Sequence, residues 1–180
     1  GDAVTIGNQT QADKLSNVSN VETLAVDGAV ALTVDGSLVS QNAFMVDGTG
    51  TAALSDVAEG TSLTFGAAAT GSGSTASLGL GVNTLDVVVA GDDAAASDVT
   101  AGLTVSGSAT VNVSSTGEEG VAQNVLNLTA ADNQTVNVTG DQDLSLGLTA
   151  ASGSTGFSMQ AGEFTGDLTA TGTSAADVMV

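Results

Sequence analysis

The residues of this chain that could bind a ligand are mostly aspartates. Three of them occur in the same tripeptide, Val-Asp-Gly, as Asp27, Asp35 and Asp47. Calcium takes about six to eight oxygen ligands from carboxylates, carbonyls and water. Asp-Gly is also a favoured turn pair, because glycine accepts a positive φ. We therefore expect either plain turns here or, where turns of successive coils stack, calcium sites at a shared edge.

Other aspartates are more densely spaced. Asp141 and Asp143 flank Gln142, and side chains two positions apart on a strand face the same side. The last aspartate, Asp177, stands near the end of the chain. No EF-hand loop is present, because its spacing and its terminal Glu are missing. The predicted metal ligands, with calcium as the ion, are Asp27, Asp35, Asp47, Asp92, Asp93, Asp98, Asp141, Asp143 and Asp177.

The residue types that are missing exclude several classes of chemistry. The chain has no His and no Cys, so that an imidazole base, a thiol nucleophile and a soft-metal site are excluded. Its only basic residue is Lys14, against 20 acidic residues, which argues against nucleic acid as a partner. A carboxylate pair for glycoside hydrolysis arises easily by chance among so many acids, and Trp and Tyr are absent. We expect no enzymatic activity.

Short runs of alternating apolar and small or polar residues recur along the chain. This period of two is typical of a strand with one buried face. Three of the runs begin at Leu24, Leu32 and Phe44, so that two steps together span twenty residues. Later runs begin about every ten residues, as at Leu126 and Val136. Apolar runs such as 87–90 are far shorter than the roughly 20 residues that a membrane span requires.

This spacing predicts an all-β fold over a single module, residues 1–180. Two or three strands would form one coil of a β-solenoid, similar to a parallel β-helix, and each would pair with its equivalent one coil away. The alternative is a β-sandwich of short strands. The short strands and the uniform Leu and Val positions favour the solenoid. Residues 66–77, 91–102 and 114–124 break the rhythm and are predicted to be loops, with a short helix at the alanines of the second as an alternative.

Two segments resemble secreted bacterial proteins. Residues 20–26, Asn-Val-Glu-Thr-Leu-Ala-Val, resemble a strand of surface-layer and adhesin-like proteins. Residues 172–180 are similar to the opening of an RTX calcium-binding nonapeptide: Gly172, Asp177 and Met179 fit, while Thr173 and Ala175 replace two glycines. The resemblance implies type I secretion, calcium-dependent folding outside the cell and a place in a surface layer, matrix or fibre. The chain also begins without a signal peptide, so we expect a part of a longer secreted protein.

The sequence thus predicts a non-enzymatic extracellular protein that self-associates into a surface layer or matrix and is stabilised by calcium. Its net charge of −19 opposes association until cations bridge the carboxylates. One alternative is a filament subunit that donates residues 1–11 or 177–180 as a strand to its neighbour. Another is an adhesin repeat that binds a surface ligand such as a cell-surface polysaccharide.

Overall fold

The computed structural model describes residues 2–15, 21–27, 29, 31–91, 99–107, 110–117, 123–131, 133–151 and 156–180. The backbones of Asp27 and Ser72 are described, but their side chains are not. Strands dominate these residues, which confirms the predicted all-β class. No helix in this part of the chain is long and apolar enough to cross a membrane.

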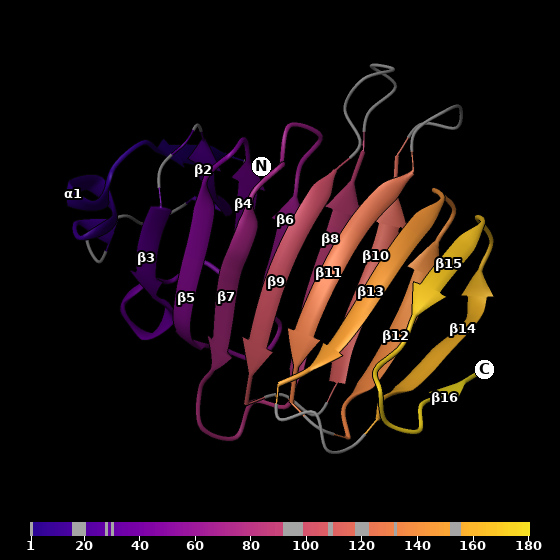
Figure 1. Ribbon diagram of the computed structural model, residues 1–180. Helices are drawn as coiled ribbons and strands as arrows, with labels where there is room; N and C mark the ends of the chain where they lie inside the picture. The colour runs from indigo at the N-terminus through magenta and orange to yellow at the C-terminus, as the bar shows by residue number, and fades with distance from the viewer. Residues whose placement is uncertain are drawn as a thin grey trace.

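The strands form two sheets, of nine and seven strands, that face each other (Figure 1). In order, sheet A consists of β1 (Ala3–Ile6), β2 (Thr23–Asp27), β4 (Ala43–Asp47), β6 (Ser62–Phe65), β8 (Thr84–Ala90), β10 (Thr110–Thr116), β12 (Thr135–Gly140), β14 (Ser158–Phe164) and β16 (Val178–Met179). Sheet B consists of β3 (Ala31–Asp35), β5 (Thr51–Val57), β7 (Ser72–Leu78), β9 (Thr100–Ser106), β11 (Asn124–Ala130), β13 (Leu144–Ala150) and β15 (Leu168–Thr171).

The chain alternates between the sheets from β2 onward, and every pairing within a sheet is parallel. Ala43 lies opposite Thr23, so one coil here takes twenty residues and contains two strands. A later coil is longer, since Asn112 lies opposite Asp86, which is 26 residues earlier. Successive strands are therefore a half-coil apart, and the solenoid is confirmed over the sandwich.

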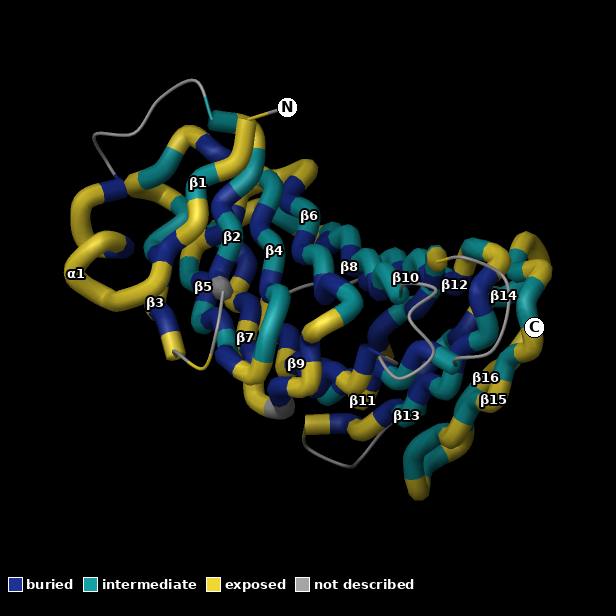
Figure 2. The backbone as a smooth tube through the Cα atoms, turned by 90° about the horizontal axis from the view of Figure 1, so that it is seen from above, coloured by how far each residue is buried: buried dark blue, intermediate teal, exposed yellow. Residues whose placement is uncertain are grey.

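The space between the sheets is filled by columns of apolar side chains. Parallel register places equivalent residues of successive coils above one another, as in Leu63, Val87, Val113 and Val138 of sheet A. All four are at most 1 % exposed. In Figure 2 buried residues, in dark blue, recur along the strands of both sheets from β2 to β13. Burying one Leu or Val side chain contributes about 1.5–3 kcal/mol, so stacked coils supply a core that single small residues cannot.

The two ends of the solenoid differ. At one end the short helix α1 (Gln9–Ala12) lies against β3, the outermost strand of sheet B (Figure 1). The Oε1 of Gln9 accepts from the N–H of Thr33 at 2.8 Å, and its Nε2 donates to the C=O of Thr33 at 2.9 Å. The Gln9 side chain thus makes the two hydrogen bonds that a neighbouring strand would make, and in this sense it is a substitute strand. At the other end β16 and β15 are the outermost strands, and Val178, Met179 and Val180 are exposed.

One predicted loop is wrong in part. Residues 66–77 contain most of β7, because the buried side chains that this strand needs are small ones, Ser74 and Ala76. The described parts of the other two predicted loops include the start of β9, the end of β10 and the first residue of β11. Residues 92–98 and 118–122, including the proposed alanine helix, lie outside the described residues. The helix that is seen, α1, was not predicted, since four residues leave little periodic signal.

Candidate functional site

The three Val-Asp-Gly aspartates do not meet at one edge. Asp27 and Asp47 end the neighbouring strands β2 and β4 and lie directly opposite each other in the register. Asp35 ends β3 in the other sheet, where it lies opposite Ser55. The reason is the half-coil alternation, which places the second of three consecutive strands on the opposite layer.

The described carboxylates of this group accept hydrogen bonds from the backbone at turns. Asp47 Oδ1 accepts from the N–H of Ala68 at 3.0 Å, across one coil. Asp35 Oδ1 accepts from the N–H and the hydroxyl of Ser37, at 2.9 and 2.6 Å, and so caps the short 3-10 helix η2 (Gly36–Leu38). Both carboxylates stabilise the turns in which they stand.

Asp143 and Asp177 link neighbouring coils in the same way. Asp143 Oδ1 accepts from the N–H of Asp167 at 2.8 Å, whereas Asp141 is exposed. Asp177 Oδ1 accepts from the N–H of Phe157 at 2.8 Å, and Asp177 Oδ2 from the N–H of Thr173 at 2.7 Å. The Phe157 N–H, helped by the N–H and hydroxyl of Thr173, holds the pKa of Asp177 below its ordinary value against an opposing effect of burial.

The acidic side chains of the described residues do not form a complete set of ligands for calcium. Nowhere in this part of the chain do three acidic groups gather closely enough to hold a metal ion. Asp27 and Asp47 are opposite each other in the backbone register, and the Asp47 carboxylate already accepts from the N–H of Ala68. The predicted ligands Asp92, Asp93 and Asp98 lie outside the described residues. Any calcium ion bound by the described carboxylates must therefore take further ligands beyond them, such as carbonyl oxygens or water.

A buried amide connects the two sheets at one corner. Asn124 is 1 % exposed and opens β11, while its Nδ2 reaches three oxygen atoms of sheet A. These are the C=O of Val89 at 3.1 Å, Oγ of Ser115 at 3.0 Å and the C=O of Thr116 at 3.2 Å. These bonds indicate a structural role for Asn124, because all three acceptors of its amide belong to the corner between the two sheets.

Polar side chains of sheet A form a ladder that crosses the strands on the outer face. Asn112 Nδ2 donates to Asp86 Oδ1 at 2.7 Å, and Asn137 Nδ2 donates to Asn112 Oδ1 at 2.8 Å. The three residues stand opposite each other in β8, β10 and β12, and Gln160 of β14 is the next position in the register. All donors point toward earlier coils, so the oxygen of Asn137 faces the later coil.

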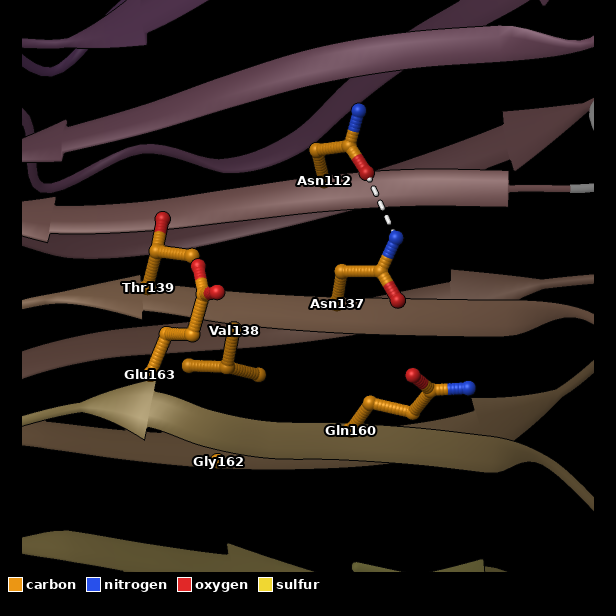
Figure 3. A pocket seen from close by; sticks show the side chains of 7 residues that line it. All are labelled: Asn112, Asn137, Val138, Thr139, Gln160, Gly162 and Glu163. Carbon is orange, nitrogen blue, oxygen red and sulfur yellow. Dashed lines mark hydrogen bonds between the residues drawn. The ribbon is translucent and has the colours of Figure 1, made fainter.

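A groove of about 430 Å³ opens beside the last rung of this ladder (Figure 3). A bulge creates it: between Asn137 and Thr139 the register shifts, so that Thr139 pairs with Glu163 instead of Gly162. In Figure 3 the amide of Gln160 points toward that of Asn137, and Glu163 extends toward Thr139. The groove is lined by Asn112, Asn137, Val138, Thr139, Gln160, Gly162 and Glu163.

The ladder and the groove were not predicted from the sequence. The signal for the ladder is present in Leu-Asp-Val at 85–87 and Val-Asn-Val at 111–113 and 136–138, where a polar residue stands between two buried ones. The signal for the bulge is weaker: it is Gly162 inside β14, because an isolated glycine within a strand often marks a bulge. Comparison with protein-family models, with curated proteins and with solved structures finds no significant match to this chain.

Proposed function

We propose that this chain is a non-enzymatic structural module that associates with copies of itself in an extracellular layer or matrix. The observation that supports this most directly is that, among the described residues, β1 and β16 are the outermost strands of sheet A and have a neighbouring strand on one side only. A strand edge presents unpaired backbone N–H and C=O groups that a strand of another chain can pair with. Here the edge at β16 also carries apolar side chains.

The exposed side chains at β16 favour association through that edge. Val178 is 57 % exposed, Met179 46 % and Val180 79 %. Joining β16 of one copy to β1 of the next would bury these side chains and continue sheet A from copy to copy. Such a contact is heterologous, and contacts of this kind form open chains of subunits where the rotation does not close.

Strand donation is less well supported than edge addition. Residues 3–6 already form β1 against β2, with Ile6 only 1 % exposed, and Val178 and Met179 already pair with β14. To donate either segment, a subunit would first have to break its own pairs. Addition to the free edge requires no such loss.

Calcium enters this proposal as a bridge between copies. The net charge of −19 makes subunits repel one another, and a divalent cation that joins carboxylates of two copies removes that repulsion. The exposed Asp141 is the kind of ligand that such a bridge needs, because it has free coordination positions.

Sedimentation velocity of the chain in chelator and in millimolar calcium tests the proposal. We expect a monomer in chelator and larger species in calcium. A chain carrying Val178→Lys and Met179→Lys should remain monomeric, because two ammonium groups would stand at the edge of β16.

A control variant places a single positive charge away from the strand edges. Leu80 is fully exposed in the turn after β7, so Leu80→Lys changes net charge but no strand edge. This variant should associate like the unmodified chain. A chain that stays monomeric at every calcium concentration contradicts the proposal and favours the adhesin-repeat alternative.

A further inference from the structure

The groove beside β14 contains polar groups that are free to bind a ligand. Among the described residues, the side chains of Thr139, Gln160 and Glu163 have no hydrogen-bond partner, and the oxygen of Asn137 has none either. They line one groove, as Figure 3 shows, on the outer face of the sheet. Convergent polar groups in a hollow are a common feature of ligand sites.

The chemistry of the lining selects the class of ligand. It contains carboxamides, a hydroxyl and a carboxylate, but no basic group, so an anionic ligand would meet Glu163 and a net charge of −19 without compensation. An apolar ligand would find only Val138, whose side chain is 1 % exposed and turned to the core. What fits is a neutral ligand rich in hydroxyl groups, because planar amides and carboxylates make paired hydrogen bonds to adjacent hydroxyls.

The ladder indicates an extended polymer over a single sugar. Its rungs Asp86, Asn112 and Asn137 lead across neighbouring strands to Gln160, and strands lie about 4.8 Å apart. That spacing is close to the length of one sugar unit in an extended β-1,4-linked chain. A chain lying across the strands would therefore meet an equivalent polar group at every unit.

We propose that this groove and the ladder leading to it, on the outer face of β8 to β14, bind an extended neutral polysaccharide. Because the lining has no aromatic ring on which a sugar could stack, binding rests on hydrogen bonds and is weak, about millimolar for one site. An assembly of many copies would present many such sites and gain avidity. The single-site binding does not depend on the assembly.

Heteronuclear NMR of the monomer in chelator, titrated with cellohexaose and mannohexaose, tests this proposal. We expect saturable shifts of the backbone amides of Asn137, Thr139, Gln160 and Gly162. Maltoheptaose, whose α-1,4-linked chain coils, should bind at least several-fold more weakly. Working in chelator separates this test from that of self-association.

Gly162 offers a variant that fills the groove. A Cβ built there meets no atom within 4 Å, and its backbone needs no glycine-specific φ, so Gly162→Leu should fold normally and obstruct the ligand. We expect affinity to fall by about tenfold. Gly7→Leu is the matched control, because its nearest contact is an ordinary 3.7 Å to Gln11 and it lies beside α1. Gln160→Ala, at an exposed position, provides a second variant that should weaken binding.

Several results would overturn the proposal. These are the absence of saturable shifts with both β-1,4 oligosaccharides, equal binding of maltoheptaose, or unchanged binding by Gly162→Leu. Saturable shifts of the same amides with calcium alone would make the groove a cation site and would overturn it as well.

Discussion

Acidic side chains at the corners of the coils act as acceptors for backbone N–H groups. Glu22 accepts from Asp2, Asp47 from Ala68, Asp143 from Asp167 and Asp177 from Phe157, each across about one coil. Backbone donors at a corner lie outside the strand ladder, and a carboxylate satisfies them with a strong, charge-assisted bond. Part of the negative charge of the chain is thus explained by the carboxylates that accept hydrogen bonds from backbone N–H groups at its turns.

The lowered pKa of Asp177 predicts a pH-dependent contact in the last coil. Because the folded pKa lies below the ordinary value of 3.8, the ionised carboxylate stabilises the fold above the unfolded pKa, and this contribution is lost as the pH falls through the folded pKa. The protection of the Phe157 amide against hydrogen exchange, relative to its intrinsic rate at each pH, should therefore fall below about pH 3.8. In Asp177→Asn this exchange should be faster at neutral pH and no longer follow that titration. A carboxyl titration by NMR at the ordinary value would contradict the prediction.

Asn124 should matter more for stability than its exposed neighbour. Asn124→Ala leaves the C=O groups of Val89 and Thr116 without their side-chain donor in a buried corner, which should cost about 1–3 kcal/mol. Asn127→Ala, on the outer face of the same strand, is the control and should change stability by less than about 0.5 kcal/mol. Urea unfolding measures both, and equal effects would show that the buried amide bonds contribute nothing.

At the scale of elements, alternation and spacing predicted the solenoid because each strand buries one face. The sum of two steps near Leu24, Leu32 and Phe44 equals one coil, so the sequence contains the coil length directly. The sequence does not show in the same way to which of the two sheets each strand belongs, and for this reason Asp35 was expected beside Asp27. Strand β7 was not predicted because its buried positions are occupied by Ser74 and Ala76, which do not produce the apolar alternation typical of a strand with a buried face.

The turn after β12 depends on a single glycine. Gly140 has φ +112°, and a Cβ there would overlap the carbonyl oxygen of Ser115 in the neighbouring strand. Gly140→Ala should therefore lower the free energy of unfolding by at least about 1–3 kcal/mol. Gly162→Ala, which meets open space, should leave stability nearly unchanged. Thermal unfolding of the two variants compares them directly, and a tolerated Gly140→Ala would contradict the turn geometry.

For the whole molecule, the net charge predicts different responses to sodium and to calcium. Sodium chloride only screens the repulsion among carboxylates. Calcium that binds the folded form alone adds about 2.7 kcal/mol at a hundredfold excess over its Kd. For a chain of this size that gain corresponds to roughly 5–11 °C in Tm. Calorimetry at matched ionic strength measures it, and equal melting temperatures in the two salts would leave screening as the whole effect.

The two ends of the solenoid predict that association has a direction. Among the described residues, β1 and β16 are the outermost strands of sheet A, whereas at the α1 end the Gln9 side chain bonds to the backbone of Thr33 in β3, the edge strand of sheet B. Gln9→Ala removes this substitute strand and leaves an N–H and a C=O of β3 free at an edge. We expect little change in the monomer's strand content but association in chelator, where the unmodified chain stays monomeric. Gln11→Ala is the matched control, because the Gln11 side chain is in the same helix and accepts from the N–H of Gly7. Light scattering in chelator separates the outcomes: if Gln9→Ala scatters no more than Gln11→Ala, α1 does not protect the edge, and the asymmetry of the ends has no consequence for assembly.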